Sequence, residues 1–433
     1  MANIAIFNFT AVYLDGQWKN MHYYNSVISA FKKRKHNVLN FITNDIILDP
    51  WNGFNISISP YVEEEVEKAL KKFKPDLIIC FNNSKINIVE KFDCPIAIWE
   101  ADTAKYFSDK DSIKKNVDRY YFIYTSQNGE ENFINLFNAK KKNLIYIENA
   151  TSIKPKKIKK IHDISFIGSL YDPDIFFNLK KSDDNYIDYM SAKERKKILL
   201  NLIGYDLKIY TNNIPLAYHS FKACNKISDK IVFDTNEVEK VINQSLISLN
   251  HSHHQAKNIG YSWRVHDILA SSSLLITEKS TLLSERFGKN IKKQFYSSAY
   301  EARKKCEYFL KNKNARLDLI AEQNEIIDKF YRWEDRIKKI EDIFGLKSEM
   351  NKKSSIIRFE IKSNLKQTLF ISFFLRFIKL VSIILRFIKF KKVYNTTNFK
   401  ILIFIFFKKR NFAIYKFLVR IKYFSNLKNR GLK

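Results

Sequence analysis

Short apolar runs alternate with amphipathic segments through most of this chain, and that alternation limits the folds it can adopt. Residues 62–73 (VEEEVEKALKKF) carry apolar side chains at helical spacing, and residues 77–81 (LIICF) follow as an unbroken apolar run. Strand, helix and strand in this order predict a parallel, doubly wound sheet. The other expected elements of this part are strands at 4–9, 38–42, 95–99, 120–124 and 144–147, and a helix at 20–34.

A second α/β series follows the basic connector 151–160 (TSIKPKKIKK). Its expected strands are 164–167, 207–210, 231–233, 246–249 and 273–277, and its expected helices are 192–202, 236–244, 263–270, 299–312, 314–329 and 332–344. At 433 residues the chain is too long for one ordinary core. We therefore predict two Rossmann-like domains, 1–155 and 156–350. Ligands of such sheets bind beyond the carboxyl ends of strands, so the loops after Phe81, Trp99, Ile167, Leu249 and Thr277 are expected to face a cleft.

The composition changes near residue 350, which predicts a third region at 351–433. This tail holds 21 Lys and Arg residues and one acid, Glu360, and so carries +20 of the chain's formal charge of +30. Residues 367–390 (QTLFISFFLRFIKLVSIILRFIKF) place their four basic residues within about 140° of a helical wheel. Because no uncharged run reaches the length of a spanning helix, we expect amphipathic helices that lie on an anionic membrane surface.

Two other interpretations of the tail stay open: extra helices packed on the body, or a nucleic-acid-binding segment. The Ile, Leu and Phe content of the tail argues against nucleic acid as a partner. The N-terminal residues 1–9 (MANIAIFNF) predict a first strand and not a signal peptide. Together with four cysteines that have no metal-ligand spacing, this favours a cytoplasmic protein, peripheral on the inner face of the cell membrane.

The most informative stretch for function is 246–288. A strand there ends in Asn250-His251, and a later helix begins with Arg264-Val265-His266-Asp267. An acid at such a helix start can accept both hydroxyls of a ribose, and a neighbouring arginine can neutralise a diphosphate. The sequence has no G-x-G-x-x-G after its first strand and no P-loop pattern, which disfavours dinucleotide binding and P-loop phosphoryl transfer.

This stretch resembles the C-terminal half of CgeB-like (spore maturation protein type) glycosyltransferases, relatives of the group-1 GT-B enzymes. The family pattern, roughly LN…N-x-R-x-F-E-A-L-A-C-G-x-L-L-L-T, is similar to residues 249–277 here. Residues 163–169 (DISFIGS) resemble the opening of the family's second domain, and the resemblance covers about residues 70–346. It departs from the pattern at Asp267, which stands for Glu, and at Ser272-Ser273, which stand for Cys-Gly. Many group-1 enzymes have a further Glu where this chain has Ile259.

The resemblance implies a GT-B fold, with a nucleotide-sugar donor in the second domain and an acceptor in the first. It assigns the donor ribose to Asp267, the diphosphate to Arg264 and to the amides of Gly168 and Ser169, and part of the sugar to Glu278. The expected donor-binding set is completed by Asn250, His251 and Thr277. GT-B enzymes usually need no metal, because helix N-termini and basic side chains stabilise the leaving diphosphate, so we expect no metal and no other cofactor.

Asp102 is the expected catalytic base of the first domain, with Asp15 and His22 as weaker candidates and a structural role for Asp102 equally open. His251, His253 and His254 resemble a metal cluster, but no suitably spaced Cys or acid accompanies them. We therefore expect a glycosyltransferase whose acceptor is a membrane-proximal glycan or lipid-linked sugar, of lipopolysaccharide or capsule type. The alternative is a degenerate GT-B scaffold or nucleotide-binding protein at the membrane surface.

Overall fold

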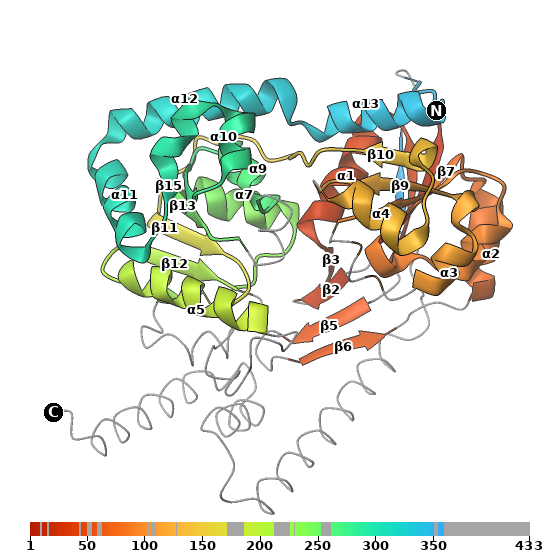
Figure 1. Ribbon diagram of the computed structural model, residues 1–433, viewed down its shortest axis with the longest axis horizontal. Helices are drawn as coiled ribbons and strands as arrows, with labels where there is room; N and C mark the ends of the chain where they lie inside the picture. The colour runs from red at the N-terminus through yellow and green to blue at the C-terminus, as the bar shows by residue number, and fades with distance from the viewer. Residues whose placement is uncertain are drawn as a thin grey trace, which may run out of the picture. The chain divides into compact units, whose positions relative to one another are not determined.

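The computed structural model describes residues 1–8, 11–14, 17–42, 45–49, 54–58, 63–101, 104, 107, 110–126, 128–170, 186–211, 226–228, 230–252, 261–349 and 354–358. The chain divides into two compact units. The first consists of Met1–Ile46, Ser57–Phe166 and Val232–Lys362, and the second of Ile47–Ile56, Ile167–Ile231 and Ser363–Lys433. Figure 1 shows the helices and strands of both units.

The first parallel sheet lies in the first unit and has the order β10-β9-β8-β7-β1-β4-β16 among the described residues. Because β1 pairs with both β4 and β7, the chain winds outward in both directions from it, as predicted for a doubly wound sheet. The strands are β1 Asn3–Asn8, β4 Asn37–Ile42, β7 Leu77–Phe81, β8 Ile96–Trp99, β9 Tyr120–Tyr124, β10 Leu144–Tyr146 and β16 Ile356–Arg358.

The two faces of this sheet are covered by different helices, and side chains along each strand alternate between them. In β1, Ile4 and Ile6 join one buried cluster, and Ala5 and Phe7 join the other. Helix α1 (His22–Lys33) contributes to the first cluster, and α2 (Glu63–Phe73), α3 (Lys110–Lys115) and α4 (Gly129–Phe137) contribute to the second. Apolar residues on both faces explain why these strands are apolar without interruption.

A second parallel sheet in the first unit has the order β11-β13-β14-β15. Its strands are β11 His162–Ile167, β13 Ser245–Asn250, β14 Leu274–Glu278 and β15 Phe295–Tyr296. Helices α9, α10, α11 and α12 gather around β13, β14 and β15 (Figure 1). The helices of this part are α7 Thr235–Asn243, α9 Arg264–Leu269, α10 Thr281–Phe287, α11 Ala299–Lys311, α12 Lys313–Phe330 and α13 Trp333–Phe344. The two parallel sheets with their helices match the predicted GT-B architecture.

Within the second unit, the described residues form α5 (Tyr186–Asn201) and β12 (Leu207–Tyr210). Helix α5 begins before residue 192, where the sequence predicted its start. A short bridge joins Ile209 to Ile227, and the amide of Ser228 donates to the Ile209 carbonyl at 2.7 Å.

A small sheet ordered β3-β2-β5-β6 was not predicted. Strands β2 (Ala11–Leu14) and β3 (Gln17–Asn20) form an antiparallel hairpin, and α1 begins only at His22. The other two strands are β5 (Asp45–Asp49) and β6 (Phe54–Ile58). Residues 231–233, predicted as a strand, are not one. The Phe233 amide donates to Glu237, and its carbonyl accepts from the His22 amide at 3.0 Å, so this backbone serves the starts of α7 and α1.

Helix α13 packs against the first sheet through Trp333. This indole is 1% exposed and packs edge-on against Tyr23 at a ring-centroid distance of 5.4 Å. Glu341 of α13 accepts hydrogen bonds from Arg34 and lies 2.7 Å from Nε2 of the buried His36. Burial opposes the ionised form of Glu341, but these two partners prevail and hold its pKa below the usual range.

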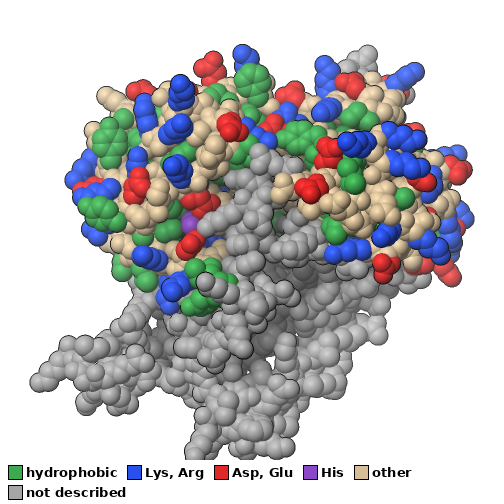
Figure 2. Space-filling model, viewed as in Figure 1, with side chains coloured by type: hydrophobic (Ala, Val, Ile, Leu, Met, Phe, Trp, Pro, Cys, Tyr) green, Lys and Arg blue, Asp and Glu red, His purple; other side chains and the backbone are tan. Residues whose placement is uncertain are grey.

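The described surface carries charges of both signs. Lys and Arg side chains lie intermixed with Asp and Glu on the face in Figure 2. Among the described residues, no helix is both long and apolar enough to cross a membrane. The tail beyond Arg358 lies outside the described residues. Cys80, Cys94 and Cys306 are free thiols.

Candidate functional site

Strands β13 and β14 bring two predicted donor-binding residues together at their carboxyl ends. Asn250 and Thr277 are register partners in the parallel ladder. The Asn250 amide Nδ2 donates to the Thr277 hydroxyl at 2.9 Å, and both side chains are buried. Since parallel strands end at the same edge, the neighbouring residues His251 and Glu278 are placed at this edge as well.

His251 and Glu278 form a buried ion pair. Imidazole Nδ1 lies 2.7 Å from Glu278 Oε2, and Glu278 Oε1 accepts the Ser252 amide at 2.8 Å. Burial alone would raise the pKa of Glu278, but the hydrogen bond and charge of His251 hold it below the usual range. The carboxylate expected to hold part of the donor sugar is thus paired with His251, another member of the expected donor-binding set.

Tyr296 is a member of this cluster that sequence reasoning missed. It pairs with Glu278 in the ladder between β14 and β15, and its side chain is buried. Its hydroxyl donates to the Asn250 carbonyl at 2.9 Å and lies 3.1 Å from His251 Nδ1. The short run at 295–296 carries no periodicity, so only the strand register reveals this residue.

The start of α9 is connected to the same cluster through two serines. The Ser262 amide donates to Ser252 Oγ at 3.4 Å, and the Arg264 amide donates to Ser262 Oγ at the same distance. The Arg264 guanidinium lies 5.0 Å from the centroid of the Trp263 ring, within cation–π range. The backbone of Arg264, which was predicted to meet a diphosphate, is therefore connected through Ser262 and Ser252 to the strand end that holds Asn250 and His251.

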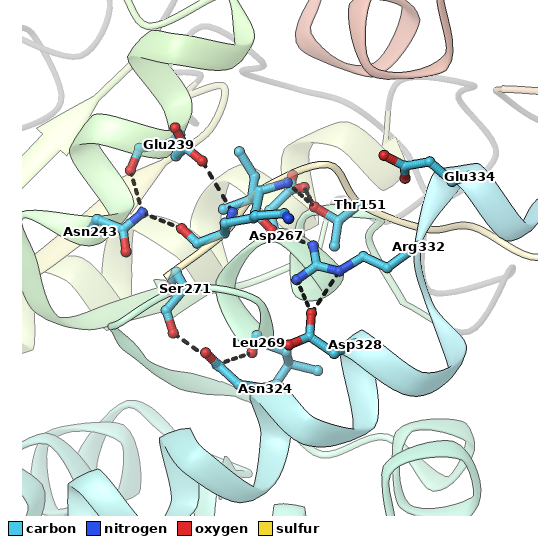
Figure 3. A network of polar contacts seen from close by, with 12 residues as sticks. Thr151, Glu239, Asn243, Asp267, Leu269, Ser271, Asn324, Asp328, Arg332 and Glu334 are labelled. Carbon is cyan, nitrogen blue, oxygen red and sulfur yellow. Dashed lines mark hydrogen bonds and ion pairs between the residues drawn. The ribbon is translucent and has the colours of Figure 1, made fainter. Parts of the chain in front are cut away.

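Asp267 is buried, and its own chain engages both of its carboxylate oxygens. The Thr151 hydroxyl donates to Oδ1 at 2.6 Å, and His22 Nε2 lies 3.0 Å from Oδ2 (Figure 3 shows Asp267 with Thr151). Asp267 is 2% exposed and His22 is 3% exposed. In this conformation a ribose does not reach the predicted ribose carboxylate. Asp267 is thus in contact with His22, which was one of the weaker catalytic candidates predicted from the sequence.

The serines after α9 are used for internal hydrogen bonds. Lys160 Nζ donates to the Ser272 carbonyl at 2.6 Å and to Ser272 Oγ at 2.9 Å. Ser273 Oγ lies 2.9 Å from Ser248 Oγ. The Asn324 amide donates to the carbonyls of Leu269 and Ser271 (Figure 3). Burial lowers the pKa of Lys160 to about 8. These contacts fix the C-terminal end of α9.

Gly168 and Ser169, the predicted diphosphate amides, lie in the second unit. The Gly168 amide donates to the Tyr210 carbonyl at 3.0 Å, and the Ser169 carbonyl accepts from Arg195 at 2.7 Å. Residues 168–170 are not helical. The Gly168 amide is thus already used by the chain.

Several predicted residues lie outside the described residues: Asp15, Asp102, His253, His254 and Ile259. A first-half carboxylate that the sequence did not single out is Glu100, just after β8. It is 1% exposed and accepts hydrogen bonds from the Ala104 amide at 3.1 Å and from Ser126 Oγ at 3.0 Å. Burial raises its pKa against these hydrogen bonds. A Cβ on Gly129 would lie 2.7 Å from Glu100 Oε2, so the start of α4 needs glycine there.

Among the described residues, no group of three or more His, Cys, Asp or Glu side chains is placed to hold a metal ion.

The chain is similar to known proteins in one sequence family and in many solved structures. Residues 191–342 match the family model described as glycosyl transferase-like. No curated protein matches the sequence. A sucrose-phosphate synthase from Thermosynechococcus elongatus is similar in structure, with a TM-score of 0.50, 10% identity and coverage of 80% of this chain and 98% of that one.

Two further solved structures have the same degree of likeness. The Anabaena HepE protein, in complex with UDP and glucose, has a TM-score of 0.51, 9% identity and coverage of 80% and 100% of the two chains. An alpha-glucosyltransferase, in complex with UDP and a 13-mer DNA, has a TM-score of 0.51, 9% identity and coverage of 79% and 99%. At these identities the likeness concerns the fold.

The family match and the fold together define this chain as an enzyme, a glycosyltransferase with the GT-B fold.

Proposed function

We propose that this enzyme transfers a sugar from a nucleoside diphosphate sugar, held at the carboxyl ends of β13 and β14, to a membrane-proximal glycan or lipid-linked acceptor. The observation that carries the donor part is the cluster of Asn250, His251, Thr277 and Glu278 on two neighbouring strand ends. Open α/β sheets bind ligands at such ends. UDP is the first nucleotide to test, because two proteins of similar fold were solved with it.

The residue roles in this proposal follow the geometry. Arg264 and His251 supply positive charge for the diphosphate, and Glu278 orients His251. Asp267 takes the ribose once His22 has withdrawn from it. Asp102 remains our proposed base, and the Ser169 amide remains a proposed diphosphate contact. The Gly168 amide joins it only by releasing the Tyr210 carbonyl. The proposal includes no metal and no other cofactor, because basic side chains can stabilise the leaving diphosphate.

The acceptor part of the proposal is supported by the tail. Its charge of +20 and its Ile, Leu and Phe content favour an anionic membrane as partner, on the cytoplasmic side, and disfavour nucleic acid. A lipopolysaccharide or capsule precursor is an acceptor of this kind. Membership in the CgeB-like subgroup, and the division into 1–155, 156–350 and the tail, belong to the same proposal.

The test is a thermal-shift screen of the full chain against UDP-, GDP-, CMP- and ADP-sugars. A donor that binds only the native state should stabilise it by about 2.7 kcal/mol at 100 times its Kd. We expect a shift with one nucleotide, and a Kd at least tenfold weaker in Glu278→Gln. Glu307→Gln on α11 is the matched control, since Glu307 pairs with Lys311 on the helix surface. A shift that is equal in both variants, or absent with every nucleotide, would overturn the donor site.

A further inference from the structure

The hydroxyl of Thr151 has a fixed direction. Thr151 lies in the chain between β10 and β11, and it is 0% exposed. Its Oγ1 accepts the Ile153 amide at 3.0 Å and donates to Asp267 Oδ1 at 2.6 Å. An amide N–H can only donate and a carboxylate can only accept, so the hydroxyl proton points to Asp267. Thr151 is therefore a fixed donor to the proposed ribose carboxylate.

The backbone around Thr151 is held without help from Asp267. The Thr151 amide donates to the Tyr331 carbonyl at 3.0 Å, and the residue forms a parallel bridge with Arg332. Arg332 in turn donates to the Ile153 carbonyl and, through Nε, to Asp328 at 2.9 Å (Figure 3 shows Arg332 between Asp328 and the chain at Thr151). Because these backbone contacts fix Thr151, its hydroxyl is in place before any ligand binds.

The bond from Thr151 fixes the orientation of the Asp267 carboxylate. The terminal torsion of an aspartate is otherwise broad, so a free carboxylate turns about its last bond. With Oδ1 held by Thr151, Oδ2 faces His22 Nε2 at 3.0 Å. A carboxylate has about four acceptor positions, so Oδ1 can accept a second hydroxyl while Thr151 stays bound. Two neighbouring ribose hydroxyls need both oxygens in fixed places, and Thr151 supplies that constraint once His22 has withdrawn.

We infer that Thr151 is a positioning residue that holds Asp267 ready to accept both hydroxyls of a ribose. The donor then belongs to the ribonucleotide class, and a sugar carried on a 2′-deoxyribonucleotide, such as thymidine diphosphate, is a poor substrate. The inference rests on the proposed function, in which Asp267 takes the ribose. Thr151 acts through Asp267 and does not touch the nucleotide itself.

Calorimetry of the full chain with UDP and 2′-deoxy-UDP tests this role, or with the diphosphate that the screen above selects and its 2′-deoxy form. Wild type should bind UDP about tenfold more tightly than 2′-deoxy-UDP, the size expected for a hydrogen bond to a charged group. Thr151→Val removes the hydroxyl, so it should weaken UDP about fivefold or more and change the Kd of 2′-deoxy-UDP by less than about twofold. Thr151→Ser keeps the hydroxyl and should restore the wild-type ratio.

The control is a buried hydroxyl at the other end of β13. Ser245 is 0% exposed, and its Oγ donates to the Val241 carbonyl at 3.1 Å. Ser245→Ala loses a comparable hydrogen bond at the amino end of the strand and should leave the ratio of the two Kd values unchanged. Thr151→Cys, whose thiol is a weaker donor, should give an intermediate ratio, and it replaces Thr151→Val if that variant does not fold.

The possible outcomes separate this inference from the proposed function. If Thr151→Val weakens both nucleotides equally, or neither, Thr151 does not position the ribose carboxylate and the inference is wrong, while the donor site stands. Equal Kd values for the two nucleotides in wild type would overturn the ribose role of Asp267 and this inference with it. If no nucleotide binds wild type, the proposed function itself is wrong.

Discussion

The contact of His22 with Asp267 should be measurable as an energetic coupling. Asp267→Ala removes the acceptor of both the Thr151 hydroxyl and the His22 imidazole, which are buried beside it. Each buried polar group left without a partner costs about 1–3 kcal/mol, so the substitution should cost about 2–6 kcal/mol of unfolding free energy. His22→Ala should cost less, because Asp267 keeps Thr151.

A double-mutant cycle isolates the His22–Asp267 coupling from the rest. Urea unfolding is measured for wild type, His22→Ala, Asp267→Ala and the double variant. We expect a coupling energy of about 1–3 kcal/mol, because the double variant should lose less unfolding free energy than the two single variants together. The matched control is a second cycle in which Glu307→Gln, on the surface of α11, takes the place of His22→Ala. The effects of Glu307→Gln and Asp267→Ala on the unfolding free energy should add to within about 0.5 kcal/mol. If the effects of His22→Ala and Asp267→Ala on the unfolding free energy also add to within about 0.5 kcal/mol, the His22–Asp267 contact is refuted.

Four further outcomes are expected. Freeing Asp267 makes it available to a ribose, so His22→Ala should tighten UDP binding several-fold by calorimetry; weaker binding would contradict the assignment. Tyr296→Phe should weaken UDP binding a few-fold while costing only about 1 kcal/mol of stability, since one hydroxyl is lost. Trp333→Ala should cost about 3–5 kcal/mol in urea unfolding, and a loss under 1 kcal/mol would argue against its burial in the first core. The lowered pKa of Glu341 adds stability that is present above its unfolded value of 4.5 and lost as pH falls below it, so Glu341→Gln should flatten the acid limb of the stability profile.

Periodicity predicted the two parallel sheets because their strands are buried on both faces or are followed by clearly amphipathic helices. It missed the β2–β3 hairpin, since four-residue strands with mixed side chains carry no reliable period. It misplaced a strand at 231–233 because apolar residues there look the same whether their backbone pairs or caps helices. Local pattern does not encode such long-range use of backbone groups.

The candidate site was predicted only in part, because the local pattern locates strand ends but not the distant residues that contact them. Asn250, Thr277 and Glu278 end two apolar strands, so the parallel register places them together. The partners that decide their chemistry come from distant parts of the sequence. His22 lies far from Asp267 along the chain, and no sequence pattern joins Tyr296 to Asn250.

The packing of α13 has a consequence for how this protein is made. Trp333, Ile337 and Ile340 complete the core cluster that covers one face of the first sheet. The strands of that sheet up to β10 are finished about 190 residues before α13 has been synthesised. At about 5–20 residues per second, the ribosome needs about 10–40 s to close that gap. During this interval an apolar face with Tyr23, Phe81 and Trp99 lacks part of its cover. The nascent chain is then a natural client of chaperones that bind exposed aromatic surface, and an enzyme cut short before α13 should aggregate and not fold as a half.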